Sequence, residues 1–251
     1  MTSNYCIIIP VYNHGSQLKA FLPKVQSLGY FIILVDDGSA TDTAVTLDDL
    51  AARHEDIDLH RLAKNSGKGG AVMAGLKRAA ELGYSHALQI DADGQHDIGQ
   101  AHAMLDASAA RPEALVVGHP IFDKSVNKLR FYARYLTHVW VWIETLSTEI
   151  KDSMCGFRIY PLQAIIPLLA TNGLGRRMDF DPEILVRAYW ADIPLKWVPV
   201  QVIYPDNGLS NFRPWGDNAL ISWMHIRLFF GMLLRLPKLL TRRIIGESPV
   251  Q

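Results

Sequence analysis

Two carboxylates one residue apart are the side chains of this sequence best suited to chemistry. Asp91 and Asp93 follow the apolar run Leu88-Gln89-Ile90 and precede a glycine. At i and i+2 on a strand they would point in the same direction. Close carboxylates repel unless a cation or proton lies between them, and their oxygens suit Mg²⁺. The pair predicts a divalent metal completed by waters and substrate phosphates; alone, it could equally shape a turn.

The elements that position this pair follow from the alternation of apolar runs along the first 110 residues. Short β-branched runs predict buried strands, separated by helical periodicity; the strands are expected at 6–11, 31–35, 58–62 and 85–90. This order predicts a parallel sheet with helices on both faces. Polar turns follow the strands at 10–13, 36–39, 65–70 and 91–97. Because the carboxyl ends of parallel strands share one edge, these turns should border a single crevice. Ser39 and Asp42 predict a capping box for the helix that ends near His54.

The second half of the chain is less regular. Further strands are expected at 114–118, at the end of a polar turn over 151–160, and at 195–204. Further helices are expected at 126–147, 179–190 and 215–245, the last interrupted near Pro237. We expect one α/β domain over residues 1–214 and an amphipathic helical extension over residues 215–251.

Common nucleotide-binding motifs are absent from the glycine-rich turn. Val72 stands where the dinucleotide fingerprint requires a small residue, and Gly69 follows Lys68 where a P-loop has Ser or Thr. In residues 91–94 the glycine comes too early for an EF-hand loop. A nucleotide bound at this crevice must therefore be held in another way.

Composition sets the broad class. The chain has 251 residues, is 49% hydrophobic and 20% charged, and has a formal net charge of zero, so nothing points to a nucleic-acid partner. Cys6 and Cys155 lie in apolar runs, which predicts reduced core residues and a cytoplasmic protein. A strand beginning near Cys6 leaves no room for a signal peptide. No uncharged apolar run approaches the ~20 residues of a bilayer span.

Five motifs in order resemble those of family 2 glycosyltransferases, which have a GT-A fold and invert the anomeric centre. They are Pro10-Val11-Tyr12-Asn13, Val35-Asp36-Asp37-Gly38-Ser39, Asn65 with Gly67-Lys68-Gly69, residues 91–97, and Asp152 with Cys155-Gly156-Phe157-Arg158. The last motif, with Glu183, resembles the dolichyl- or polyprenyl-phosphate sugar transferase branch. The ending also resembles transferases associated with bacterial lipid or aryl-polyene assembly.

The resemblance implies roles residue by residue. It implies Mg²⁺ or Mn²⁺ at Asp91 and Asp93, and Arg130 facing the phosphates of a UDP- or GDP-sugar. The implied donor-binding residues are Pro10, Tyr12, Asn13, Val35, Asp36, Asp37, Lys68, Asp91, Ala92 and Gln95. Asp93, Asp152, Glu183 and Arg130 are the implied catalytic residues, and Arg158, Ser210 and Arg213 border the acceptor side. Asp36 remains an alternative to Asp37 as the base-contacting carboxylate, and Lys68 could be a solvated loop lysine.

The sequence does not determine the identity of the acceptor substrate. His119-Pro120 stands where the polyprenyl branch has an arginine, and Pro205 replaces another. A lipid phosphate acceptor is already anionic, whereas a hydroxyl of a glycan, lipid or aryl polyene needs a general base. Asp152, Asp181 and Glu183 are candidate bases, although acids at 181 and 183 also suit a helix N-terminus. A nucleotide-sugar-binding protein without turnover is a further alternative.

Residues 215–245 carry too many apolar side chains for a solvated helix. They could pack on the sheet or on an oligomer partner. Alternatively they lie on a membrane, with basic residues meeting anionic headgroups; these are Arg227, Arg235, Lys238, Arg242 and Arg243. We expect peripheral attachment to the cytoplasmic face, because the implied acceptor is a lipid. The oligomeric state, the donor base and the sugar are left open.

Overall fold

A computed structural model describes residues 3–94, 97–121, 128–171, 173–201 and 213–245, without the side chains of 128–133, 243 and 245. The strands are β1 (Tyr5–Val11), β2 (Phe31–Asp36), β3 (Ile57–Arg61), β4 (His86–Gln89), β5 (Leu115–Ile121), β6 (Arg158–Pro161) and β7 (Leu195–Gln201). The helices are α1 (Gly15–Gln26), α2 (Thr41–Arg53), α3 (Lys68–Glu81), α4 (Ala101–Ala110), α5 (Lys128–Thr145), α6 (Leu162–Leu169), α7 (Phe180–Trp190) and α8 (Pro214–Ile245), with a short 3₁₀ helix at Ile98–Gln100.

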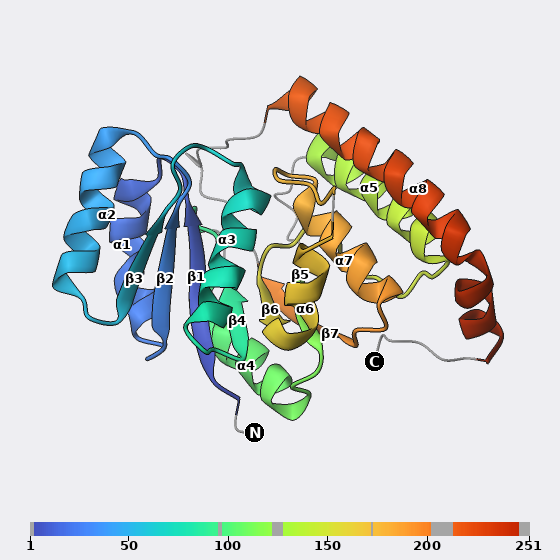
Figure 1. Ribbon diagram of the computed structural model, residues 1–251, viewed down its shortest axis with the longest axis horizontal. Helices are drawn as coiled ribbons and strands as arrows, with labels where there is room; N and C mark the ends of the chain where they lie inside the picture. The colour runs from blue at the N-terminus through green and yellow to red at the C-terminus, as the bar shows by residue number, and fades with distance from the viewer. Residues whose placement is uncertain (1–2, 95–96, 122–127, 172, 202–212, 246–251) are drawn as a thin grey trace.

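The seven strands form one sheet in the order β3-β2-β1-β4-β6-β5-β7 (Figure 1). β6 pairs antiparallel with both β4 and β5, and the other neighbouring pairs are parallel. The expectation of an α/β fold with a mainly parallel sheet is therefore confirmed.

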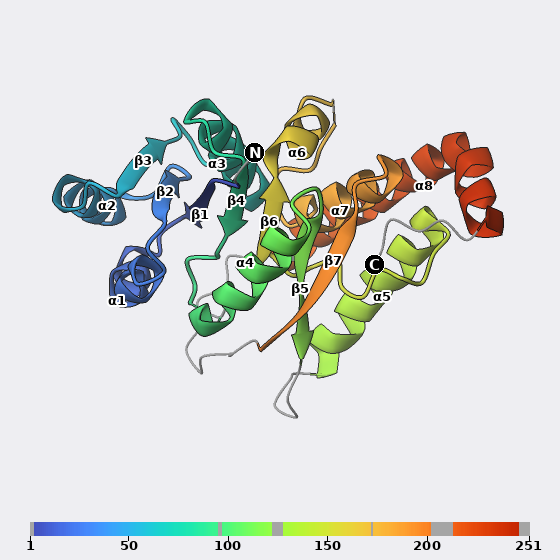
Figure 2. The same ribbon diagram turned by 90° about the horizontal axis from the view of Figure 1, so that it is seen from below.

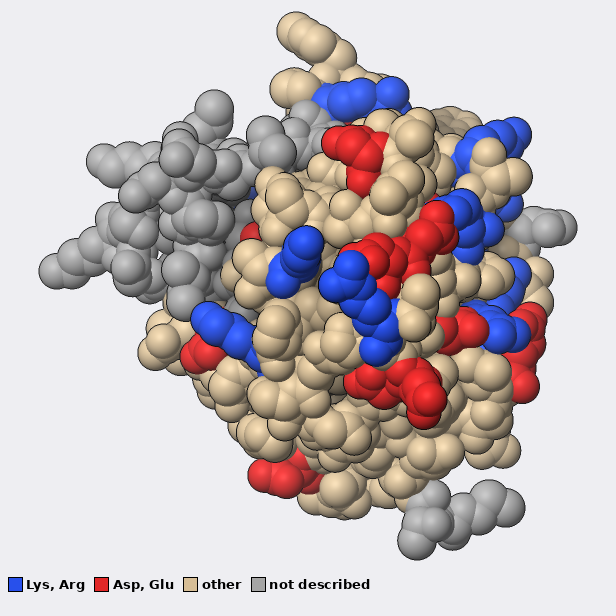
Figure 3. All heavy atoms as spheres, turned by 90° about the vertical axis from the view of Figure 1, so that its left-hand side faces the viewer, with Lys and Arg blue, Asp and Glu red and all other residues tan. Residues whose placement is uncertain are grey.

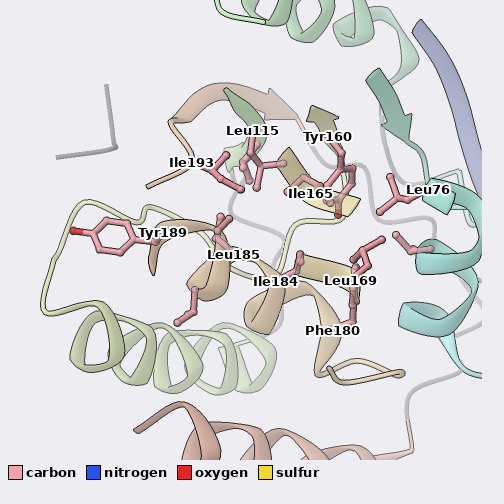
Figure 4. Close-up of a cluster of buried hydrophobic side chains, with 14 of the residues drawn as sticks. Leu76, Leu115, Tyr160, Ile165, Leu169, Phe180, Ile184, Leu185, Tyr189 and Ile193 are labelled. Atoms are coloured by element: carbon pink, nitrogen blue, oxygen red, sulfur yellow. The ribbon is translucent and has the colours of Figure 1, made fainter. Parts of the chain in front are cut away.

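Two hydrophobic cores lie on opposite faces of the sheet. Successive residues of a strand point to opposite faces, so Ile7 and Ile9 join the core beneath α1 and α4, whereas Cys6 and Ile8 join the core beneath α3 and α7. Figure 2 shows these helix pairs on the two sides of the sheet. In Figure 4, Phe180, Ile184 and Leu185 of α7 point toward the sheet side chains Leu115 and Tyr160.

The two cysteines are buried and unpaired, as predicted. Burial raises the pKa of each thiol to about 12. Neither sulfur is therefore a thiolate near neutral pH, and both act as small core side chains.

Two local expectations are wrong. β4 ends at Gln89, and Ala92 and Asp93 lie in a turn, so strand alternation does not set the directions of Asp91 and Asp93. α2 begins at Thr41 with Ala40 as its N-cap and has no side-chain capping bond. Ser39 instead accepts a hydrogen bond from another turn, which displaces the predicted capping box.

Surface charges of both signs lie next to each other on the face that includes α1 and α2 (Figure 3). On this side Arg53 pairs with Asp49, and Arg61 pairs with Asp36 and Asp48. The exposed pairs with Asp49 and Asp48 contribute about 0–1 kcal/mol each, whereas Asp36 is buried.

Candidate active site

Asp37 joins the second and third polar turns. Its Oδ1 accepts from the Ser66 N–H at 2.6 Å, and its Oδ2 accepts from the Gly67 N–H at 2.9 Å. The residue is buried, and desolvation raises the pKa of its carboxyl despite the opposing effect of these N–H groups and Arg177. Asp37 thus holds the glycine-rich turn directly beside the end of β2.

Asn13 joins the first and second turns. Its N–H donates to Ser39 Oγ at 3.1 Å, and its Oδ1 accepts from the Ala40 N–H at 2.8 Å. The Asp37 N–H also donates to the carbonyl of Val11 at 2.9 Å. Asn13 has a φ of 56°, a left-handed conformation that asparagine tolerates better than most residues.

Lys68 joins the third turn to the fourth. Its Nζ donates to Asp91 Oδ2 at 2.9 Å and pairs with Asp181 Oδ2 at 3.0 Å. Behind them, Tyr160 donates to Gln89 Oε1 at 3.0 Å and Gln89 donates to Asp91 Oδ1 at 3.1 Å. These contacts bring the four turns together at one edge of the sheet, where the crevice is expected.

The carboxylates at this crevice suit a magnesium or manganese ion. Asp91 and Asp93 offer oxygen ligands beside a chain of polar groups, and Lys68 already brings a positive charge to Asp91. Among the described residues, no group of three or more His, Cys, Asp or Glu could hold a metal. Mg²⁺ is usually bound by one or two carboxylates plus substrate phosphates.

Asp152 is held by an arginine that the sequence analysis does not single out. Arg134 donates to both Asp152 oxygens, at 2.7 and 2.6 Å. Asp152 Oδ1 also accepts from the N–H groups of Met154 and Cys155. The carboxylate therefore shapes the segment before β6, and Arg134 is the α5 arginine found beside it. The side chain of Arg130 lies outside the described residues, as do Gln95 and Ser210.

Three expected contacts with a ligand are not supported by the structure. The side chain of Val35 is fully buried in the core. Asp36 is also buried and accepts from the Ser39 N–H and from Arg61, so Asp36 is not the carboxylate that faces the crevice. Arg158 is fully buried and donates to the carbonyls of Cys155, Asp181 and Ser153. Its effect on the acceptor side is to position this segment.

Glu183 is not placed as a general base. It is fully buried on α7, where its Oε1 pairs with Arg187 at 2.6 Å and its Oε2 pairs with Arg227 of α8 at 3.0 Å. Its Oε2 also accepts from the Gly175 N–H at 2.8 Å. These partners make Glu183 a link between two helices and a loop.

Replacing Glu183 by Gln should therefore lower stability and spare turnover. Breaking a buried ion pair costs about 3–5 kcal/mol. Because Arg187 and Arg227 stay partly hydrated, we expect about 2 kcal/mol, which lowers the melting temperature by about 4–8 °C. Calorimetry and the turnover of the folded protein measure the two effects, with exposed Glu55→Gln as the control. A loss of turnover without a loss of stability would indicate that Glu183 is a general base.

The remaining candidates are placed as follows. Pro10 and Tyr12 are half-buried at the end of β1, and Ala92 is buried between the two acidic residues. The main-chain N–H of Arg213 donates to Asp217 at 2.7 Å, at the start of α8. Asp217 also pairs with Arg177, which connects α8 to the loop before α7.

Two residues that sequence reasoning missed are Gln89 and Gly156. Gln89 is a fully buried polar residue. It interrupts an apolar run of the sequence, and that interruption could have identified it as a site residue. A Cβ on Gly156 would lie 2.8 Å from Asp91 Oδ2, from Gln89 Nε2 and from Lys68 Nζ. Glycine is needed there because the segment before β6 packs directly on the polar cluster.

An apolar groove of about 390 Å³ lies between α5 and α8. Its lining residues are Leu136, Thr137, Trp140, Asn218, Ile221, Ser222, His225, Ile226, Phe229 and Phe230. Figure 1 shows the two helices lying side by side. Thr137 lies one turn from Arg134, which is paired with Asp152, and Asn218 follows Asp217, which is paired with Arg177. The groove therefore begins near the crevice.

α8 has one buried and one exposed apolar face. Ile221, Met224, Leu228, Met232 and Leu239 join the core, whereas Trp215, Trp223, Phe230 and Leu234 are 92%, 58%, 61% and 83% exposed. Within Pro214–Arg242 an 18-residue stretch has a mean hydropathy of 1.4, so this helix is long and apolar enough to span a membrane, by length and composition only. No uncharged run here reaches that length, as the sequence analysis states, but a span tolerates a few charges, so that criterion did not identify this helix.

The basic residues of α8 have partners within the chain. Arg227 pairs with Glu183, Lys238 and Arg242 pair with Asp192, and Arg235 lies over the ring of Trp190. Part of their charge is therefore balanced within the chain, although Arg235 and Lys238 are exposed. The side chain of Arg243 lies outside the described residues.

Comparisons with known proteins agree with this geometry. The model of the family described as glycosyl transferase family 2 matches residues 6–162. A dolichyl-phosphate beta-glucosyltransferase of Trichomonas vaginalis is 29% identical over 77% of this chain, and one of Dictyostelium discoideum is 27% identical over 93%. The chain spans 62% and 76% of the lengths of these two relatives.

A similar solved structure is glucosyl-3-phosphoglycerate synthase from Mycobacterium tuberculosis in complex with Mn²⁺ and UDP-glucose. It has a TM-score of 0.67 and 12% identity, and the match covers 92% of this chain and 79% of that one. At this identity the likeness establishes the shared GT-A fold alone.

Proposed function

Because this chain belongs to glycosyl transferase family 2, we propose that it is an inverting, metal-dependent enzyme that moves a sugar from a UDP- or GDP-sugar to a lipid phosphate. The observation that carries the proposal is the direct contact among four strand-end turns, with Asp91 and Asp93 at one of them. The two relatives named as dolichyl-phosphate beta-glucosyltransferases support a polyprenyl phosphate as the acceptor.

The donor end of the site is built from Asp37, Lys68, Asp91 and Asp93. Asp91 and Asp93 would hold Mg²⁺ or Mn²⁺, which as a Lewis acid would stabilise the charge that develops on the departing diphosphate. Lys68 Nζ lies beside Asp91 and contributes a second positive charge to the same region. Asp37 keeps the glycine-rich turn in place, with its N–H groups at the edge of the crevice.

The acceptor end is formed by the segment before β6 and by the groove between α5 and α8. A lipid phosphate is anionic and attacks without a general base, which agrees with Asp152 and Glu183 both being held by arginines. The groove is apolar and begins near Asp152, so it suits the hydrocarbon chain of the acceptor. We propose that the exposed face of α8 lies on the cytoplasmic face of the membrane that carries this lipid.

The proposal is tested by incubating the protein with a radiolabelled UDP- or GDP-sugar, Mn²⁺ and polyprenyl phosphate. Label should pass into the organic phase with one of these donors and should remain in the aqueous phase when EDTA is present. Transfer only to hydroxyl acceptors would replace the lipid phosphate. Binding with no transfer and no donor hydrolysis would indicate a binding protein without turnover.

Donor binding should also raise thermal stability. A ligand at about 100 times its Kd stabilises the native state by about 2.7 kcal/mol, which corresponds to about 5–11 °C for a chain of this size. A thermal-shift panel of UDP, GDP and their sugars, each with and without Mn²⁺, identifies the base from the largest shift. ADP serves as the control nucleotide. No shift with any nucleotide would contradict a nucleotide-sugar crevice.

A further inference from the structure

Lys68 lies between two carboxylates that come from different halves of the chain. Its Nζ is 2.9 Å from Asp91 Oδ2, after β4, and 3.0 Å from Asp181 Oδ2, in the first turn of α7. The exposed fractions of the three side chains are 21%, 17% and 6%. The lysine therefore balances charge in a partly desolvated cluster, where an unpaired carboxylate would be costly.

Asp181, the carboxylate on α7, is held in place by its surroundings. The main-chain carbonyl of Asp181 accepts from buried Arg158 at 2.8 Å. The neighbouring Phe180 packs so tightly on the glycine-rich turn that a Cβ on Gly69 would lie 2.3 Å from it. Asp181 Oδ1 is buried and has no hydrogen-bond partner, so the carboxylate has spare accepting capacity beside Lys68.

The same lysine opposes a metal at Asp91. In this structure Asp91 Oδ1 accepts from Gln89, and Asp91 Oδ2 accepts from Lys68. An ammonium and a dication at one carboxylate repel each other. A metal that takes Asp91 as a ligand must therefore weaken or break the contact with Lys68.

We propose that Lys68 is a built-in counter-cation that competes with the metal for Asp91, and that Asp181 is a positioning residue that retains Lys68 when it leaves Asp91. The inference rests on the proposed function. The donor diphosphate supplies the new anionic partner for Lys68, so metal and donor bind cooperatively. Without the donor, Lys68 keeps Asp91 neutralised and metal affinity low.

The test measures Mn²⁺ binding by titration calorimetry, which requires no turnover. Wild-type protein should bind Mn²⁺ weakly alone and more tightly with UDP or GDP, whichever the protein binds. Lys68→Met should bind Mn²⁺ alone at least about tenfold more tightly, because a unit positive charge about 4 Å away is removed. The gain from the nucleotide should shrink in this variant. Lys68→Arg keeps the charge and should behave as wild type, and exposed Lys77→Met on the same helix is the matched control.

A thermal melt gives a second reading of the same variant. Lys68→Met leaves Asp91 and Asp181 without their shared cation, so its melting temperature should fall in EDTA and recover with Mn²⁺ by more than that of wild type. If Mn²⁺ binds Lys68→Met no more tightly than wild type, Lys68 does not compete with the metal for Asp91. The proposed metal site itself is not contradicted by that result. If neither protein binds Mn²⁺ even with a nucleotide, the metal-dependent function fails as well.

The role of Asp181 is separated by a double-mutant cycle. Asp181→Asn should weaken Mn²⁺ binding in the wild-type background, because Lys68 is left with Asp91 as its only carboxylate partner among the described contacts. The same change should matter less in the Lys68→Met background, and Asp181→Glu should restore binding. Equal effects in both backgrounds would show that Asp181 acts independently of Lys68.

Discussion

Replacing Asp93 by Asn should lower kcat/KM by about 10³-fold while leaving the fold intact. A metal acting as a Lewis acid lowers a barrier by several kcal/mol, and each 1.36 kcal/mol is a factor of ten in rate. Asp93 is half-buried in the turn after β4, so the change removes a ligand charge without opening a cavity. The loss should exceed that of any other single carboxylate at the crevice except Asp91.

Sugar transfer at saturating Mn²⁺ measures this effect, alongside a thermal melt. Asp106→Asn is the matched control because Asp106 is an exposed carboxylate on α4, and it should change neither quantity. Retention of more than a tenth of wild-type turnover by Asp93→Asn would contradict the metal role. In that case the two aspartates would only shape the turn after β4, which is the alternative given in the sequence analysis.

Removing the exposed apolar face of α8 should abolish membrane binding. Burying a large apolar side chain contributes about 1.5–3 kcal/mol. Replacing Trp215, Trp223, Phe230 and Leu234 by Gln should therefore lower vesicle partitioning by at least about 10³-fold. Since the basic residues of α8 pair within the chain, wild-type binding should depend little on salt or on the fraction of anionic lipid.

Flotation with neutral and anionic vesicles measures this partitioning. The contrasting variants are Met224→Ala and Leu228→Ala on the buried face of the same helix. They should cost about 2–5 kcal/mol of stability each and leave vesicle binding of the folded protein unchanged. If the variant with all four substitutions still floats with vesicles, the exposed face of α8 is not the membrane-binding surface. A lower oligomeric state of this variant than of wild type, measured by light scattering, would then show that a second copy covers the face.

The sequence was sufficient for the parallel half of the fold. The β-branched runs at Cys6–Val11 and Phe31–Asp36 can only be stable when buried on both faces, so their neighbours had to be helices. The polar turns after them then had to share an edge, and the contacts of Asn13, Asp37 and Lys68 confirm it. Local pattern and long-range arrangement agree here because each strand is followed by its own helix.

The same reasoning could not decide between neighbouring carboxylates. Asp36 and Asp37 are adjacent, and only the register of β2 determines that Asp36 meets Arg61 while Asp37 meets the glycine-rich turn. The partner of Asp152 could not be predicted from the sequence either. Arg134 and Arg130 are the same residue type and differ only in their position on α5. The ion pairs of Glu183 could not be predicted either, because its partners Arg187 and Arg227 depend on the packing of α8 against α7.

The antiparallel strand also has a consequence for the order of folding on the ribosome. β4 can pair with β1 once residue 89 is made, but its other edge waits for β6, and Leu115 of β5 waits for Leu195 of β7. Contacts between distant residues form slowly because the intervening chain must first be ordered. During synthesis the nascent chain therefore carries one unpaired edge on β4 and two on β5 beside the paired strands β3, β2 and β1, and we expect that interval to be the one in which chaperones are needed.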